Sequence, residues 1–418
     1  MSTLPVREYL NFFINNEKYL NQLKPSAFTL DNIKKLLKLL GDPQDRLNII
    51  HVAGSKGKGS TCAFTAQILY EAGYKVGLYT SPHLEDVTER IRILGETNSK
   101  GIFVDAISEK KFQKTLEAIK PAIEKIRQVT YFEVLTALAV FYFAQEKIDF
   151  AVLETGLGGR LDATNVGLSK VCAITPIGLE HTAILGNTLA KIAVEKTVII
   201  KDARQKVVVA PQVSEVQKVI EERCRKFNIQ PVLVESLDKH FKISLLGQHQ
   251  RVNAATAIEI IKCLRQLNFT VSDKAIQEGL QKTYWPGRFE IVQKEPTIIL
   301  DSAHTPESAR VLADTMQEMF PDKKVLLILG IADDKDKQAI GRALNKIADK
   351  VVVTRFDHPR ASYFKSEELK DIFLNKECVQ TDNVREALDL VTQEEIVLVT
   401  GSIFLIGEVR RLCINTRV

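Results

Sequence analysis

The fold follows from the stretch Leu47-Asn-Ile-Ile-His-Val-Ala-Gly-Ser-Lys-Gly-Lys-Gly-Ser60. Its short apolar run, Leu47 to Ala53, predicts a buried strand that ends at a glycine loop. Apolar residues at helical spacing follow the loop and predict a helix that Gly73 ends. Because Val76 to Thr80 predicts the next strand, the segment forms one strand–loop–helix–strand unit.

The same alternation continues along the chain and predicts a mostly parallel sheet that helices cover on both faces. The first forty residues are predicted to be helical, because apolar residues recur at helical spacing between Leu30 and Leu40 and Thr29 or Asp31 could cap that helix. The further elements of this first part are a helix at 130–146 and strands at 150–154, 171–175 and 207–210.

A second, smaller doubly wound α/β unit is predicted from residue 297 onward. Its elements are strands at 297–300, 324–329, 350–354 and 395–400 and helices at 306–319 and 337–349. Pro286-Gly287, a turn signal, stands between the two series. We therefore expect one domain in residues 1–286 and another in residues 287–418.

Length and composition are those of a globular protein with two domains. The chain has 418 residues, of which 45% are hydrophobic and 26% charged, and these values exclude a disordered or fibrous protein. The net charge of +5 suits small anionic substrates and does not favour nucleic acid. The six cysteines are scattered, and neither a signal sequence nor a membrane-spanning run is apparent. We expect a cytoplasmic protein with reduced thiols and no membrane contact.

The glycine loop Gly54-Ser55-Lys56-Gly57-Lys58-Gly59-Ser60 stands where a phosphate-binding loop stands, between a strand and a helix. Its glycines let backbone N–H groups turn toward phosphate oxygens, and the helix N-terminus adds partial positive charge. Lys58 is predicted to reach the β- and γ-phosphates of ATP, and the hydroxyl of Ser60 or Thr61 to enter the shell of Mg²⁺. An extra glycine separates the lysine from the hydroxyl, and a glycine turn without a ligand is the alternative.

Two glutamates are candidates for chemistry beside the loop. Glu133 stands in Thr130-Tyr-Phe-Glu133 before an apolar run, and this spacing is also that of a helix capping box, which needs no ligand. Glu154 ends a predicted strand ahead of a glycine turn, at the edge of the sheet where ligands bind. A carboxylate that only closes the turn is the alternative for Glu154.

Other polar residues follow the predicted strands of both domains. His181 comes after the strand at 171–175, and Asp301 and His304 come after the strand at 297–300, so all three are predicted at ligand-binding sheet edges. A hydrogen-bonded loop histidine is the alternative for His181, and a solvated surface lysine is the alternative for Lys196 on the next helix. The charged run at 333–337 is predicted to be a solvated loop.

Taken in order, the motifs resemble those of the folylpolyglutamate synthase/dihydrofolate synthase family, which belongs to the Mur ligase superfamily. The resemblance covers nearly the whole chain. Its motifs are His51-Val-Ala-Gly-Ser-Lys-Gly-Lys-Gly-Ser-Thr61, Tyr79-Thr-Ser-Pro-His-Leu84, Thr88-Glu-Arg-Ile-Arg92, Tyr131-Phe-Glu-Val-Leu-Thr-Ala137, Leu153-Glu-Thr-Gly-Leu-Gly-Gly-Arg-Leu-Asp-Ala-Thr-Asn165, Gly178-Leu-Glu-His181, Gly247-Gln-His-Gln250 with Asn253-Ala-Ala255, Pro286-Gly-Arg-Phe289, Asp301-Ser-Ala-His304 and Thr400-Gly-Ser402.

The resemblance implies a large N-terminal P-loop domain of the Mur ligase central type and a smaller Rossmann-like C-terminal glutamate ligase domain. It implies that the loop binds ATP together with Asn253, Arg288, Asp301 and His304. The implied Mg²⁺ ligands are Ser60, Ser81, Glu133 and His181. The implied catalytic residues are Lys58, Glu133, His181 and Lys196. Lys196 would be carbamylated, because a carbamate can bind the metal ion that an ammonium repels.

The chain departs from the family pattern near these positions. The family usually has asparagine at the position of Lys56, although some members have lysine there. The departures are Ser55-Lys56 for Thr-Asn, Glu180 for Asp, Ser302 for Gly, Thr305 for Asn, and Thr197-Val198 for Ala-Gly. The last of these crowds the site of the carbamate.

The implied activity is ATP-dependent addition of L-glutamate to a folate, to dihydropteroate or to both, through an acyl phosphate. No residue decides between the two acceptors, and a monomer is the family's habit. A Mur ligase that acts on a peptidoglycan precursor is one alternative, and a nucleotide-binding module without catalysis is another. The Gly-Lys-Gly-Ser loop argues against the first, and the retained acid, histidine and lysine positions argue against the second.

Overall fold

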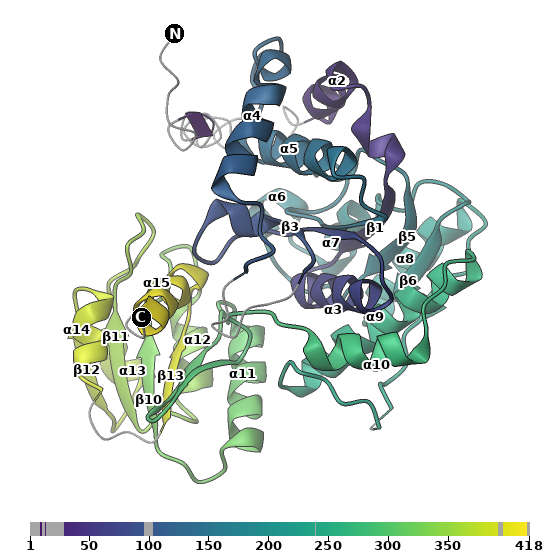
Figure 1. Ribbon diagram of the computed structural model, residues 1–418. Helices are drawn as coiled ribbons and strands as arrows, with labels where there is room; N and C mark the ends of the chain where they lie inside the picture. Colours follow the sequence, from purple (N-terminus) through teal and green to yellow (C-terminus); the bar gives the residue numbers. More distant parts are fainter. Residues whose placement is uncertain are drawn as a thin grey trace.

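The computed structural model describes residues 9–10, 13, 29–95, 103–238, 240–391 and 396–415. These residues form two sheets, each with helices on both faces (Figure 1). Helix α2 (Asp31–Leu39) confirms the last part of the predicted N-terminal helix, and the Thr29 hydroxyl accepts the Asp31 N–H at 3.2 Å. The rest of that prediction lies outside the described residues, apart from 9, 10 and 13.

The first sheet has seven strands in the order β3-β2-β4-β1-β5-β6-β7, and only the edge pair β2–β3 is antiparallel. The strands are β1 (Asn48–Ala53), β2 (Val76–Tyr79), β3 (Ile91–Ile93), β4 (Phe150–Glu154), β5 (Ser169–Ile174), β6 (Lys206–Val209) and β7 (Val232–Leu233). Ile50 and Val52 of β1 point to one face and Ile49 and Ala53 to the other, as alternation along a strand requires.

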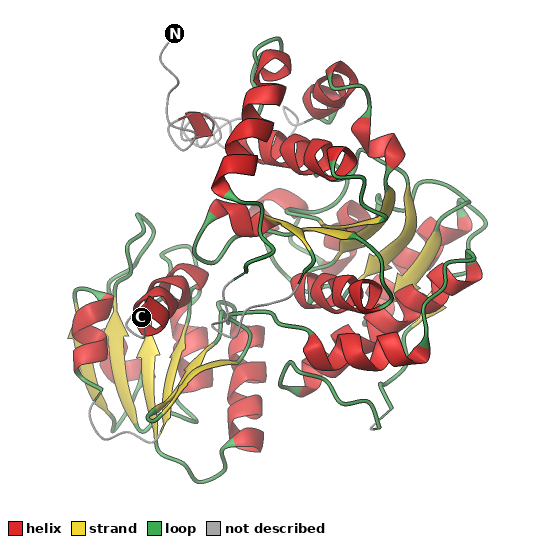
Figure 2. Ribbon diagram, viewed as in Figure 1, coloured by secondary structure: helices red, strands yellow, loops and turns green. Residues whose placement is uncertain are grey.

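Two layers of helices cover these faces (Figure 2). One layer contains α3 (Lys58–Glu71), α9 (Gln248–Gln266) and α10 (Asp273–Lys282). The other contains α2, α4 (Glu109–Ile123), α5 (Tyr131–Gln145), α7 (Leu189–Thr197) and α8 (Ser214–Arg225). The predicted parallel sheet with both faces covered is confirmed.

The second sheet has six strands in the order β12-β11-β10-β13-β9-β8, with β8 antiparallel at its edge. The strands are β8 (Glu290–Lys294), β9 (Thr297–Leu300), β10 (Val325–Leu329), β11 (Lys350–Thr354), β12 (Glu377–Thr381) and β13 (Ile396–Thr400). The helices are α11 (Pro306–Met319), α12 (Lys337–Leu344) and α13 (Ser366–Ile372) on one face, and α14 (Val384–Asp389) and α15 (Ile403–Asn415) on the other.

The predicted helix at 337–349 is too long, since α12 ends at Leu344. The Lys376 ammonium donates to the carbonyl of Ala348 and to that of Asn345, which a helix extended to Asp349 would need for the Asp349 N–H. Asp349 then exchanges hydrogen bonds with Val325, from its N–H at 2.9 Å and to its carboxylate at 2.8 Å, which turns the chain into β11.

The two halves of the chain meet around Arg410 of α15. Its guanidinium donates to the carboxylates of Glu85 and Glu290 and to the Tyr284 hydroxyl, the last at 2.7 Å. Glu85 belongs to the segment after β2, whereas Tyr284 and Glu290 flank the Pro286-Gly287 turn. Within the described residues, no helix is long and apolar enough to cross a membrane.

Candidate active site

The glycine loop adopts a backbone conformation that requires glycine at two positions. Gly54 has φ 149° and Gly57 has φ 81°, a region that side chains disfavour. Space is lacking as well, because a Cβ at Gly54 would collide with the Thr175 side chain and one at Gly57 with Asn253. The loop is therefore confined between the end of β5 and α9. The predicted strand–loop–helix context is confirmed.

The backbone amides of the loop serve two purposes. The N–H groups of Ser55 and Lys56 both donate to the Pro176 carbonyl at 3.0 Å. These two amides are therefore held by the neighbouring segment of the same domain. The N–H groups of residues 58–60 precede the first intrahelical bond of α3, at the positive end of that helix. These first-turn amides are the part of the loop suited to a phosphate.

Two lysine ammonium groups meet at the carbonyl of Gly54. Lys58 Nζ donates to this oxygen at 3.1 Å and Lys196 Nζ at 2.7 Å. Lys196 also donates to the Glu180 carboxylate at 2.7 Å and is 1% exposed, so a solvated surface lysine is wrong. Burial and the Lys58 charge lower the pKa of Lys196 to about 8, although Glu180 opposes this shift. A buried amine with this pKa deprotonates readily, as reaction with CO₂ requires.

Glu154 lies at the same sheet edge as the loop. It ends β4, its side chain is buried, and its carboxylate accepts the Ser81 N–H at 3.1 Å. Burial raises the pKa of this carboxyl, and the cations Lys58 and Arg288 oppose the shift. Its neighbours thus belong to α3, to the segment after β2 and to the turn that leads into the second sheet.

Glu133 has a different environment, at the start of α5. Its carboxylate accepts the Thr130 N–H at 2.8 Å and the Ile33 N–H at 3.2 Å, while the Thr130 hydroxyl accepts the Glu133 N–H at 3.2 Å. Burial raises the pKa of Glu133, and hydrogen bonds from Thr130 and Ile33 oppose this shift. These contacts form the capping box, extended to α2. They do not connect Glu133 with the glycine loop.

His181 and the loop hydroxyls complete the first-domain side of the site. His181 is exposed at the start of the short helix α6 (Thr182–Leu185), and its charged neighbours are Glu180, Lys335, Lys196 and Lys58. Thr61 Oγ1 and Thr155 Oγ1 are buried without a hydrogen-bond partner in the described structure. Over the same described residues, no three Asp, Glu, His or Cys side chains converge as a metal centre.

The second domain presents three predicted residues at the carboxyl end of β9. Asp301 accepts the N–H groups of Phe289 and Ala303, both at 2.9 Å, and burial raises its pKa against the charge of Arg288. The Arg288 guanidinium donates to the Gly287 carbonyl at 3.0 Å. Burial lowers the pKa of His304 to about 4, so its imidazole is neutral at pH 7.

One functional candidate was missed at the sequence level. Lys335 lies in the loop after β10, where the charged run was predicted to be solvated, and it pairs with Asp334 at 2.8 Å. Its charge nevertheless acts on Lys56, His181 and His304, from both domains. Only the alternation of strands could have indicated this position, because the loop follows the carboxyl end of β10.

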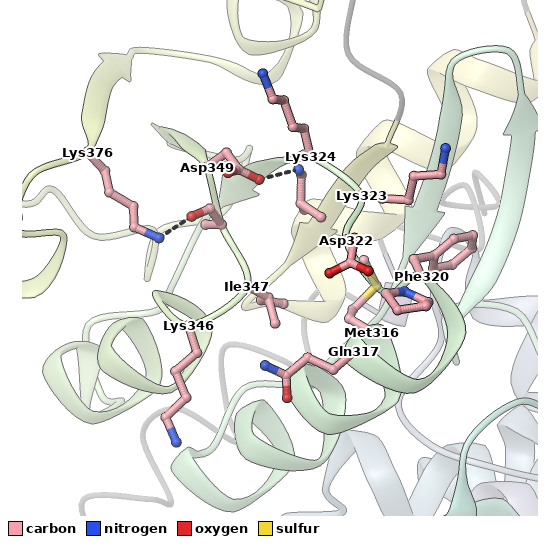
Figure 3. Close-up of a pocket in the computed structure, with 13 residues that line it drawn as sticks. Met316, Gln317, Phe320, Asp322, Lys323, Lys324, Lys346, Ile347, Asp349 and Lys376 are labelled. Atoms are coloured by element: carbon pink, nitrogen blue, oxygen red, sulfur yellow. Dashed lines mark hydrogen bonds between the residues drawn. The ribbon is translucent and has the colours of Figure 1, made fainter.

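A hollow of about 560 Å³ lies elsewhere, where the chain enters β10 and β11 (Figure 3). Lys324, Lys346 and Lys376 are among its lining residues. It is at the amino ends of these strands, whereas ligands of α/β sheets bind at the carboxyl ends. The hollow is therefore separate from the candidate site.

Comparison with known proteins agrees with this architecture. The family model "Mur ligase, glutamate ligase domain" matches residues 287–403. The dihydrofolate synthase/folylpolyglutamate synthase of Bacillus subtilis is 35% identical over 413 residues, covering 91% of this chain and 94% of that protein.

Two solved structures superpose on nearly the whole chain. Folylpolyglutamate synthase of Mycobacterium tuberculosis complexed with ADP has a TM-score of 0.84 and 29% identity, covering 96% of this chain and 98% of that one. The bifunctional folylpolyglutamate synthase/dihydrofolate synthase of Yersinia pestis complexed with AMPPNP and Mn ion has a TM-score of 0.81 and 30% identity, covering 98% of both chains. The chain belongs to the folylpolyglutamate synthase/dihydrofolate synthase family.

Proposed function

We propose that the protein is an ATP-dependent ligase that adds L-glutamate to folates, as a folylpolyglutamate synthase that can also take dihydropteroate. The observation that carries this proposal is the 35% identity to the Bacillus subtilis enzyme over more than nine tenths of both chains. The site supports it, because lysines and helix N-termini gather where a triphosphate and a carboxylate would meet.

The reaction has two balanced steps. A carboxylate oxygen of the acceptor bonds to the γ-phosphorus of ATP, and the bond from that phosphorus to the β–γ bridging oxygen breaks, which releases ADP and leaves an acyl phosphate. The neutral amine of L-glutamate then attacks the acyl carbon, the phosphate leaves with the bonding electrons, and the nitrogen loses a proton. Both steps depend mainly on positioning and on neutralising charge.

Individual residues are proposed for these tasks. The amides of residues 58–60 and the ammonium of Lys58 hold the β- and γ-phosphates. Asn253, beside Gly57, holds the nucleotide from the first domain. Arg288, Asp301 and His304 hold the rest of it from across the domain boundary. Buried Lys196, with its lowered pKa, is proposed as a carbamate.

The residues present fit a Mg²⁺ ion when Glu154 is the acidic ligand, and they do not fit one when Glu133 is. Ser60, Ser81 and Glu154 offer oxygen atoms near Lys58, with His181 at the rim, and Mg²⁺ needs few protein ligands when phosphates supply others. Glu133 does not fit this set, because its carboxylate is directed to the backbone amides of Thr130 and Ile33, and these hydrogen bonds do not reach the loop. We therefore propose Glu154 instead of Glu133 as the acidic ligand. When bound, the ion offsets the charge of the phosphates.

Each of the two sheets belongs to a domain with its own proposed task. We propose residues 1–286 as the ATP-binding domain and residues 287–418 as the glutamate ligase domain, which must close over the nucleotide. We propose a cytoplasmic monomer whose partners are ATP, L-glutamate and a folate or dihydropteroate, with neither nucleic acid nor membrane among them.

The proposal is tested by ADP release with L-glutamate and one acceptor at a time. Tetrahydrofolate, dihydropteroate and a UDP-muramyl substrate separate the two folate activities from a Mur ligase. Glutamate-dependent release with either of the first two is expected. Release with the UDP-muramyl substrate alone, or with none of the three, contradicts the proposal.

A further inference from the structure

The Lys56 side chain crosses from the glycine loop to the second domain. Its ammonium donates to the Thr305 hydroxyl at 2.9 Å, over a sequence separation of 249 residues. Thr305 is the N-cap of α11, and its hydroxyl also accepts the Ser308 N–H at 3.3 Å. One oxygen atom therefore joins the first turn of α11 to the loop.

Positive charge is concentrated around this contact. The N-terminus of α11 is partially positive, and so is that of α3, which begins two residues after Lys56. Burial lowers the pKa of Lys56, the carboxylates of Glu180 and Glu307 oppose this shift, and Lys58 and Lys335 add to it. Such an arrangement gains stability when a polyanion joins it. An ammonium has three donors, so Lys56 can hold Thr305 and an anion together.

The contact depends on the length of the lysine side chain at position 56. An asparagine side chain is too short to span the distance that the four-carbon stem of lysine covers. Lys56 and Thr305 are therefore complementary, because a long cation on the loop meets a hydroxyl acceptor on α11.

We propose that Lys56 is a positioning residue that links the phosphate loop to α11, so that nucleotide binding and docking of the C-terminal domain stabilise each other. The inference rests on the proposed function of the loop as a nucleotide site. Asp301 and His304 lie directly before α11, so docking this helix brings both residues toward the same nucleotide. By linkage, whatever docks the domain also tightens nucleotide binding.

A double-mutant cycle tests the link without requiring turnover. The affinity for AMPPNP with Mg²⁺ is measured for the full chain and for Lys56→Met, Thr305→Val and the double variant. Thr305→Val is expected to weaken binding about tenfold in the native background, as loss of a charge-assisted hydrogen bond predicts, and less than about twofold in the Lys56→Met background. An equal loss in both backgrounds overturns the proposal.

Two controls separate the link from loss of the helix cap. Thr305→Ser keeps the hydroxyl and is expected to bind AMPPNP within about twofold of the native protein. Asn383→Ala removes the N-cap of α14 in the same domain and is expected to leave the affinity unchanged. If Thr305→Ser or Asn383→Ala weakens binding as much as Thr305→Val, the link is refuted. Glutamate-dependent ADP release by the native protein tests the proposed function separately.

Discussion

Glu133 and Glu154 are both buried glutamates of the first domain, but the groups around their carboxylates differ. The carboxylate of Glu133 accepts backbone N–H groups at the starts of α5 and α2. The carboxylate of Glu154 accepts one N–H, from Ser81, and faces the charges of Lys58 and Arg288. A buried acid whose partners are amides stabilises the fold, whereas one whose partners are cations from several elements is available for chemistry.

The largest effect on turnover is expected from Lys58→Ala, which removes a cation beside Glu154. Loss of the ammonium that faces the phosphates should lower glutamate-dependent ADP release by about 10³-fold, because positioned charge dominates phosphoryl transfer. The fold should persist, since Lys58 makes one hydrogen bond to its own loop. Turnover and the thermal midpoint are measured side by side, with Lys262→Ala on the outer face of α9 as control. Unchanged turnover would refute the role.

Glu154→Gln is expected to have the next largest effect. The variant keeps an acceptor for the Ser81 N–H but loses the negative charge beside Lys58, so turnover should fall by about 10²-fold. If this charge helps to hold Mg²⁺, part of the loss should return as the Mg²⁺ concentration is raised. The measurement is kcat/KM against Mg²⁺ concentration. A loss that does not depend on Mg²⁺ would contradict the metal-binding role.

The strands that were predicted from the sequence are those with strong apolar patterns. The strands at 150–154, 297–300 and 350–354 were predicted at their observed ends. The polar edge strands β8 and β12 were not predicted, because most of their side chains are at least partly exposed. The end of α12 depends on Lys376 and Val325, which are remote in sequence, so helical spacing could not locate it.

Contacts between residues remote in sequence also limited what could be predicted of the site. Because Glu154, Asp301 and the loop each follow a predicted strand, they were predicted at sheet edges. The structure brings them to one region. The choice between capping and chemistry at Glu133 depends on Ile33, which lies 100 residues away and supplies the second N–H. The resemblance favoured the metal role for Glu133, whereas the contacts favour the capping interpretation that the spacing alone had indicated.

A smaller effect, of several-fold, is expected when the pH is raised and the rate at which Lys196 takes up CO₂ is measured. Only the neutral amine reacts, and with a pKa of about 8 its neutral fraction rises about eightfold between pH 7 and pH 8.5. Protein depleted of CO₂ should therefore take up ¹³CO₂ faster at the higher pH at fixed dissolved CO₂, with a carbamate signal in the ¹³C NMR spectrum. Lys196→Arg, which keeps the charge, is the control. Absence of the signal from the native protein would contradict carbamylation.

The smallest effect on turnover, and a distinct effect on stability, is expected from Glu133. In Glu133→Ala the N–H groups of Thr130 and Ile33 lose their acceptor in a buried place, which should cost about 1–3 kcal/mol of unfolding free energy. Glu133→Gln retains one carbonyl oxygen and should lose less. Both should keep kcat within about threefold and show the native Mg²⁺ dependence, because the carboxylate contacts α5 and α2 and not the loop. Urea unfolding measures the first expectation, and Mg²⁺ titration of turnover measures the second. If Glu133→Gln were as stable as the native protein but needed more Mg²⁺, the roles of the two glutamates would have to be exchanged.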